Sequence, residues 1–157
     1  MSAAAAPSLI AGVDGDISVL AAEITGLNNP FLFTDASDLT IGQVGTLSGI
    51  STNNGDVTLR TESGSLTLAA PVSAGDPVTG SATADLAAAS DLILNDVVTA
   101  HSILLSAGDA ITQSQGASVS ATNLGLAAVT APALKGDIEE LAVELTGLET
   151  SLECING

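Results

Sequence analysis

The sequence predicts an all-β protein whose short strands stack as a β-solenoid, and three observations indicate this. Short alternating apolar segments, separated by turn residues, run from end to end. Two aromatic residues, Phe31 and Phe33, with 16 glycines imply a narrow core of thin aliphatic layers. Internal repetition, typical of stacked folds, is also present. A β-sandwich is the alternative that alternating strands leave open.

The repeat joins the two ends of the chain. Residues 15–27 read GDISVLAAEITGL, and residues 136–148 read GDIEELAVELTGL, 121 positions later. Nine of these positions are identical, and two mismatches exchange one apolar residue for another. We therefore expect residues 1–157 to form one solenoid segment, slightly more than one copy of a repeat of about 121 residues that belongs to a longer protein.

Strands are expected wherever apolar residues alternate, and each is only three to five residues long. The clearest are Ile17-x-Val19, Leu39-x-Ile41, Val57-x-Leu59, Leu66-x-Leu68, Leu92-x-Leu94, Ile103-x-Leu105 and Leu124-x-Leu126.

Turns are expected where glycine stands beside Asp or Asn, because glycine accepts positive φ and Asp bonds nearby backbone. The first of these spacings suit a coil of about 20 residues, and the later ones require loops of varying length. These turns are Gly15-Asp16, Asn54-Gly55-Asp56, Gly75-Asp76 and Gly108-Asp109.

The segment 136–153 fits two structures. Its apolar residues make a helical stripe, with Asp137 and Glu140 placed like a capping box. Leu141-x-Val143-x-Leu145 fits a strand equally well, and the matching copy at 15–27 contains β-branched residues that favour strand. We predict a strand, with a short C-terminal helical cap as the alternative.

Charge excludes two classes of partner. Arg60 and Lys135 oppose 18 acidic residues, which gives a net charge of −16. Nucleic acids and anionic membrane surfaces are bound through clustered cations, so both are excluded as partners. The scattered acids favour solubility. No apolar run is long enough for membrane insertion, and no secretory signal is recognisable, so an export signal is expected on a longer parent chain.

Chemistry-bearing residues do not form a recognisable site. His101 has Asp91, Asp96 and Asp109 nearby in sequence, but no nucleophile elbow is present, and residues 99–102 resemble a turn between strands. Cys154 is the lone cysteine, so no internal disulfide can form, and near a chain end it has no fixed base.

The sequence does not favour calcium, phosphate or ice binding. Asp14-Gly15-Asp16 and the segment 35–38 match no calcium-loop pattern and are interpreted as solvated turn acids. Residues 42–45 lack the lysine of a phosphate loop, and the threonines do not form regular ladders on the pattern of ice-binding solenoids. These threonines are Thr58, Thr67 and Thr112. We predict no catalytic, cofactor-binding or metal-binding residues.

Several segments resemble the β-strand repeat regions of filamentous-haemagglutinin-like adhesins of two-partner secretion, which are large bacterial exoproteins. The similarity covers most of residues 10–148 and is carried by Leu39-Thr-Ile, Gly49-Ile-Ser-Thr-Asn-Asn-Gly-Asp-Val-Thr-Leu, Gly64-Ser-Leu-Thr-Leu and Gly108-Asp-Ala-Ile-Thr-Gln. The resemblance implies a right-handed parallel β-helix shaft that projects from the outer membrane and positions adhesive regions.

These observations favour a non-enzymatic stalk or display segment of a bacterial surface or secreted adhesin-like exoprotein. Its expected partners are neighbouring coils of a longer parent chain, a second copy joined end to end, or surface glycans. The competing hypothesis is a carbohydrate-binding or carbohydrate-active β-helix. Enzymes of that class need clustered acids with cations and aromatic platforms, and this chain has one Arg, one Lys and two Phe.

Overall fold

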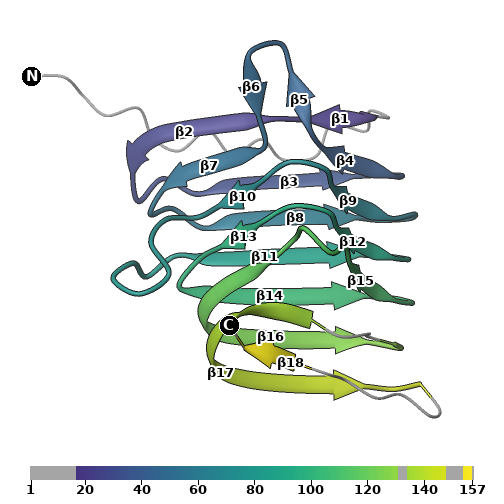
Figure 1. Ribbon diagram of the computed structural model, residues 1–157. Helices are drawn as coiled ribbons and strands as arrows, with labels where there is room; N and C mark the ends of the chain where they lie inside the picture. Colours follow the sequence, from purple (N-terminus) through teal and green to yellow (C-terminus); the bar gives the residue numbers. More distant parts are fainter. Residues whose placement is uncertain (1–16, 131–133, 148–153, 157) are drawn as a thin grey trace, which may run out of the picture.

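The computed structural model describes residues 17–130, 134–147 and 154–156, and within these ranges every regular element is a strand. The chain runs through three faces in turn, and we call one circuit of the three faces a coil. Each coil lies against the preceding one (Figure 1). Strands of successive coils pair in parallel. The all-β prediction is confirmed, and the parallel pairing differs from the antiparallel sheets that the β-sandwich alternative requires.

The first face carries the longer strands. Its members are β3 (Phe31–Asp35), β8 (Val57–Thr61), β11 (Thr83–Ala88) and β14 (Ser102–Ala107).

The second face is a sheet of five short strands. Its members are β1 (Val19–Leu20), β4 (Leu39–Ile41), β9 (Leu66–Leu68), β12 (Leu92–Leu94) and β15 (Ile111–Gln113).

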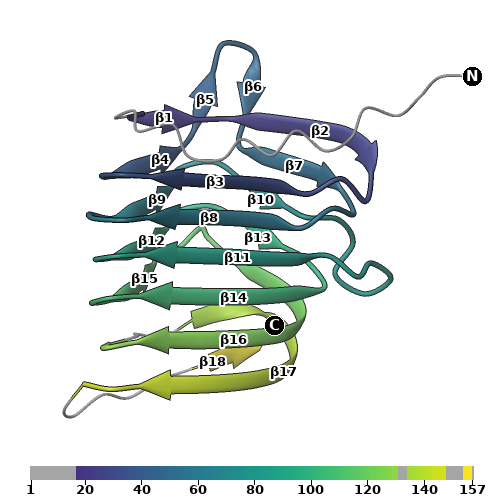
Figure 2. The same ribbon diagram turned by 180° about the vertical axis from the view of Figure 1, so that it is seen from behind.

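The third face joins the first through two long strands, β16 (Val119–Ala128) and β17 (Leu134–Leu145), which run through both faces. This continuity merges the two faces into one sheet (Figure 2). The other third-face strands are β2 (Ala22–Leu27), β7 (Ile50–Asn53), β10 (Val72–Ser73), β13 (Val98–Thr99) and β18 (Cys154–Asn156).

Aliphatic ladders fill the space between the faces. Strand register aligns Phe33, Leu59, Leu86, Leu105 and Leu126 in one inward row, and each is at most 4 % exposed. Burial of one such side chain stabilises the fold by about 1.5–3 kcal/mol. Both phenylalanines lie in the first described coil of this face, so the later layers contain no aromatic side chain, as the composition predicts.

Coil length varies because the corners between faces vary. The paired residues are separated by as few as 17 positions (Leu124 and Leu141) and as many as 28 (Ala22 and Ile50). One corner contains an antiparallel hairpin, β5 (Gln43–Val44) and β6 (Leu47–Ser48), which projects beyond the first coil in Figure 1. Gly45, with φ of +61°, opens its two-residue loop, where a type II′ turn prefers glycine.

Two sequence expectations need correction. The alternation expected for Ile17-x-Val19 would point Val19 toward the core, and this is wrong. β1 pairs Val19 with the outward Thr40 and Leu20 with the inward Ile41. The helical-cap alternative is wrong over residues 134–145, which form β17, since pairing with β16 outweighs the helical stripe. Residues 148–153, over which the cap would extend, lie outside the described residues.

The two copies of the repeated motif occupy different places in the stack. Ala22 of the first copy lies on the third face, whereas its counterpart Val143 lies on the first. Residues 15, 16 and 148 of the copies fall outside the described residues.

Candidate functional surfaces

Aspartates at the corners link one coil to the next. Ser65 N–H donates to Asp38 Oδ1 at 2.7 Å, and Thr83 N–H donates to Asp56 Oδ1 at 2.8 Å. In each case the carboxylate accepts a hydrogen bond from the backbone N–H of a residue 27 positions later in the chain. Asp91 does the same for Ala110 at 3.1 Å. These acids therefore act as structural clamps between coils.

The calcium candidate at residues 35–38 is occupied by protein contacts. Asp35 is buried, and its Oδ1 accepts from Ser37 N–H at 2.9 Å, while its Oδ2 accepts from Ile17 N–H at 3.4 Å. In the ranges that the structure describes, no three His, Cys, Asp or Glu side chains gather closely enough to hold a metal ion. The other candidate, Asp14-Gly15-Asp16, lies outside those ranges.

The histidine and its sequence neighbours are separated by the fold. His101 lies between β13 and β14, at the corner of the third and first faces, in the turn that the sequence predicted. Asp96 lies between the second and third faces, whereas Asp91 and Asp109 lie between the first and second. The acids that a Ser-His-Asp arrangement would need therefore lie at other corners of the coil.

His101 instead contacts the loop between β10 and β11. Its Nδ1 lies 3.2 Å from the carbonyl oxygen of Pro77, which also accepts a hydrogen bond from Thr122 Oγ1 at 2.9 Å. At the start of the same loop, the Asp76 carboxylate accepts hydrogen bonds from the backbone N–H groups of Val78 and Thr79, at 2.9 and 2.7 Å. These bonds lower the pKa of Asp76 below its ordinary value, because they favour the charged form.

The remaining sequence candidates do not converge. Thr67 and Thr112 share an outward row on the second face, which Ile93 interrupts, and Thr58 lies on the first face. Residues 42–45 belong to the hairpin and the turn before it. Cys154 begins β18, which pairs with β17.

A polar hollow of about 320 Å³ lies at the corner between the third and first faces. Asn28 and Asn54 line it, and both have positive φ. Their amides bond to each other, and Asn54 Oδ1 also accepts from Ser81 N–H at 3.0 Å. Because these polar atoms already bond across three coils, the hollow forms part of the framework.

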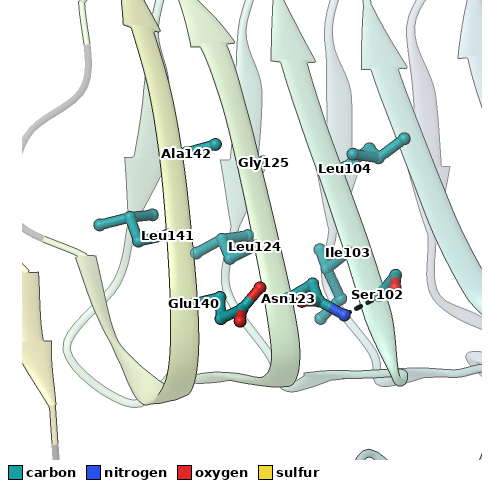
Figure 3. Close-up of a pocket in the computed structure, with 9 residues that line it drawn as sticks. All are labelled: Ser102, Ile103, Leu104, Asn123, Leu124, Gly125, Glu140, Leu141 and Ala142. Carbon is teal, nitrogen blue, oxygen red and sulfur yellow. Dashed lines mark hydrogen bonds between the residues drawn. The ribbon is translucent and has the colours of Figure 1, made fainter.

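A second hollow, of about 340 Å³, lies on the outer side of the first face (Figure 3). It exists because Gly125 interrupts the outward row between Leu104 and Ala142. A Cβ at Gly125 would approach Leu104 Cδ2 to 2.8 Å, so the leucine leans over the glycine. Sequence reasoning missed this hollow, because an isolated glycine in a strand does not reveal its neighbours on adjacent coils.

Polar residues border one side of this hollow. Strand register aligns Ser102, Asn123 and Glu140 in one row, and Asn123 Nδ2 donates to Ser102 Oγ at 3.4 Å (Figure 3). Hydroxyl, amide and carboxylate groups can bond to the hydroxyls of a polar ligand. Glu140 is the one carboxylate among the lining residues, whereas glycoside hydrolysis uses a pair.

Arg60 forms an ion pair, whereas the hydrogen bonds of Lys135 are made by its backbone. Arg60 Nη2 lies 2.5 Å from Asp85 Oδ2 on the first face. Lys135 contributes its backbone, which donates to Gln113 Oε1 at 2.6 Å and accepts from Gln113 Nε2 at 2.8 Å. Gln113 occupies the inward row that Leu68 and Leu94 fill in earlier coils, and there its amide pairs with the β17 backbone.

Comparison with known proteins finds no matching protein family, curated protein or solved structure. Among residues 17–130, 134–147 and 154–156, no helix has the length and apolarity needed to cross a membrane.

Proposed function

We propose that this chain is a non-enzymatic structural segment, a right-handed parallel β-helix that extends and displays regions of a bacterial surface or secreted adhesin-like exoprotein. The observation that carries the proposal is the unbroken parallel pairing along the first face, from β3 to β17. Backbone hydrogen bonds of this kind can carry mechanical load along the stack and keep the coils at a fixed spacing. This role requires no catalytic group.

The right-handed winding belongs to this proposal. Crossover connections between parallel strands are right-handed in about 98 % of cases, because a right-twisted strand packs back onto its sheet only in that sense. Circular dichroism alone does not fix the hand, whereas an experimental electron-density map would, and a left-handed coil would contradict this part of the proposal.

The distribution of acids also supports a structural role. Asp38, Asp56 and Asp91 lie at corners and accept hydrogen bonds from backbone N–H groups of the next coil. Carboxylates used in this way hold coils together, and they are spread along the stack instead of converging on one surface. Enzymes that cleave glycans need acids gathered at one place.

Sequencing the locus on both sides of this reading frame tests the stalk proposal. We expect in-frame repeats of the Gly-Asp-Ile motif together with a secretion domain. A closed single gene without such repeats would overturn the stalk role. Neighbouring coils of the parent chain are the partners expected on this proposal, and the outer surface of the bacterium is the expected location.

Carbohydrate binding is the second candidate, and the hollow beside Gly125 favours it. The row of Ser102, Asn123 and Glu140 offers polar groups next to the apolar Leu104. Screening wild-type protein and an Asn123→Ala variant against a panel of neutral and acidic oligosaccharides tests it. Binding that Asn123→Ala abolishes would support this role, and absence of binding to every sugar would exclude it.

A further inference from the structure

The loop between β10 and β11 contains the Asp76–Pro77 peptide bond, the one aspartyl-prolyl bond in the sequence. This loop projects from the side of the stack (Figure 1). Asp76 is exposed and Pro77 is partly buried, so the bond lies within reach of water.

An aspartyl-prolyl bond contains both a nucleophile and a good leaving group. The aspartate carboxylate can attack its own main-chain carbonyl carbon and close a cyclic anhydride. The proline nitrogen is a tertiary amide nitrogen, and it leaves as a secondary amine, which is more basic than the primary amine released from other residues. In an unfolded chain the reaction is slow, because the carboxylate is seldom oriented for attack and no fixed donor stabilises the charge that develops on the carbonyl oxygen.

The folded loop holds the nucleophile in one place. Asp76 Oδ1 accepts hydrogen bonds from Val78 N–H at 2.9 Å and from Thr79 N–H at 2.7 Å. These two bonds restrict the side chain relative to the backbone that follows it, and they favour the ionised form, which is the nucleophile. The entropy of orienting the carboxylate is therefore lost when the chain folds and not at the moment of reaction.

A backbone donor already contacts the carbonyl oxygen of the same bond. Gly80 N–H donates to Asp76 O at 3.1 Å. Negative charge develops on this oxygen when the carbonyl carbon is attacked, and a donor that is in place beforehand stabilises that charge. Glycine is required at residue 80 for this approach, because a Cβ there would overlap Asp76 O.

The segment after the bond is anchored separately from the segment before it. The carbonyl oxygen of Pro77 accepts a hydrogen bond from Thr122 Oγ1 at 2.9 Å and lies 3.2 Å from His101 Nδ1. Both partners belong to later coils, whereas Asp76 follows β10 directly. The two sides of the bond are therefore held by different parts of the stack.

We propose that the Asp76–Pro77 bond is a self-cleavage site, at which the Asp76 carboxylate cuts the chain of the folded protein. Asp76 Oδ2 attacks the main-chain carbonyl carbon of Asp76 and forms a C–O bond, while Gly80 N–H stabilises the oxyanion. The C–N bond to Pro77 then breaks, and the nitrogen takes a proton from the solvent and leaves as a secondary amine. Water opens the cyclic anhydride to a side-chain carboxylate and a new α-carboxylate, so the overall reaction is hydrolysis of the peptide bond.

This reaction occurs once in each chain and involves no turnover. The inference goes beyond the stalk role and does not depend on it.

The cleaved protein should remain one particle. Strands from the two sides of the bond pair with each other, β10 with β13, β8 with β11 and β9 with β12. Pro77 also lines a hollow together with Asp137 and Glu139, so the cation formed at the Pro77 nitrogen gains acidic neighbours. We therefore expect residues 1–76 and 77–157 to separate only when the protein is denatured.

Intact-mass spectrometry of the purified 157-residue protein, incubated in mildly acidic buffer, tests the proposal. Two fragments, residues 1–76 and 77–157, should accumulate at least about tenfold faster from the folded protein than from the same protein unfolded in guanidinium chloride at the same pH. Equal or faster cleavage of the unfolded chain would overturn the proposal, because the fold would then contribute nothing. Absence of both fragments from the folded protein would overturn it as well.

Two variants of the nucleophile make the test specific. Asp76→Asn keeps an oxygen that accepts from Val78 and Thr79, so we expect the loop to persist, but it lacks the carboxylate and should not form the fragments. Asp76→Glu keeps a carboxylate displaced by one methylene group and should cleave at least about tenfold more slowly. Cleavage of Asp76→Asn at the wild-type rate would assign the cut to a contaminating protease and overturn the proposal.

Three further variants test the leaving group, the oxyanion donor and the background. Pro77→Ala replaces the tertiary amide, and Gly80→Ala displaces the N–H that contacts Asp76 O, so each should slow cleavage at least about tenfold. Gly116→Ala, in a turn away from this loop, should cleave at the wild-type rate. Urea midpoints establish that each variant is folded under the assay conditions. Wild-type rates in both Pro77→Ala and Gly80→Ala would contradict the proposed reaction.

Size-exclusion chromatography of the cleaved protein completes the test. A single native peak that contains both fragments, which separate on denaturing electrophoresis, supports cleavage within an intact stack. Two native peaks would overturn the expectation that pairing across the cut holds the protein together.

Discussion

Asn28 and Asn54 occupy the same corner in successive coils, and Asn54 Nδ2 donates to Asn28 Oδ1 at 2.8 Å. Both residues have positive φ, 57° and 59°. Asparagine tolerates this left-handed conformation better than most residues, and its amide can bond in both directions along the stack. The pair therefore adopts the backbone conformation that the sharp turn requires, and its amides bond polar groups that the turn would otherwise leave unpaired.

This corner predicts a graded response to substitution at Asn54. Asn54→Ala loses the amide bonds and strains the backbone, so we expect a loss of about 2–3 kcal/mol in the free energy of unfolding. Asn54→Gly keeps the positive φ at no steric cost and should lose about 1 kcal/mol less. Urea denaturation measures both, and equal losses would show that φ strain has no part in the effect.

A second prediction compares two glycines. Gly64 has φ of +81°, and a Cβ there would overlap the Asp38 carboxylate that accepts from Ser65. We expect Gly64→Ala to cost about 2–4 kcal/mol in stability. Gly116 is exposed with open space around its Cβ position, so Gly116→Ala should change stability by less than about 0.5 kcal/mol. Thermal unfolding of the two variants side by side checks this, and similar melting temperatures would refute it.

A third prediction concerns the inward and outward rows of the first face. Leu86 is 0 % exposed between Leu59 and Leu105, whereas Leu104 is 48 % exposed. Leu86→Ala should leave a cavity and cost about 2–5 kcal/mol. Leu104→Ala should cost less than about 0.5 kcal/mol. Chemical denaturation distinguishes them, and a larger loss for Leu104→Ala would mean that the assigned register is wrong.

A fourth prediction follows from the lowered pKa of Asp76. The backbone N–H of Thr79, then that of Val78, favour the charged carboxylate in the folded state. This stabilisation is present above the ordinary pKa of 3.8 and is lost as the pH falls through the lowered folded value. The urea midpoint of the wild type should therefore exceed that of Asp76→Asn near pH 6, and the difference should shrink in strong acid.

An NMR titration of the Asp76 side chain provides the direct check on this prediction. Its midpoint should lie below 3.8, and a midpoint above that value would contradict the hydrogen bonds assigned to Val78 and Thr79. A difference between wild type and Asp76→Asn that stays constant with pH would do the same.

Strands with strong apolar contrast were predictable from the sequence, and those with weak contrast were not. Leu39–Ile41, Leu66–Leu68 and Leu92–Leu94 alternate large aliphatic with other residues, and each is a strand with the predicted bounds. β11 was missed because its inward residues include Ala84 and Ala88, which differ little from the outward Ala87. Small residues carry little periodic signal even where their burial is complete.

The corner acids show a different limit of sequence reasoning. Asp38 was expected to be a solvated turn acid and Asp56 a turn residue that bonds nearby backbone, and both lie between strands. Their bonds to Ser65 and Thr83, each 27 residues later, depend on which coils are neighbours. Local sequence does not contain that information, because corner lengths vary. The hollow at Gly125 was missed for the same reason, since Leu104 lies 21 positions earlier.

The uneven corners have a consequence for how such a chain can change. Three short stretches per coil define the stack, and the hairpin at residues 43–48 shows that an insertion between them leaves the strand pairing of β4 and β7 intact. Insertions and deletions at the corners can therefore occur without changing the residues that form the core. Two chains with the same architecture can differ in length at every turn, and only their inward positions then remain comparable residue by residue.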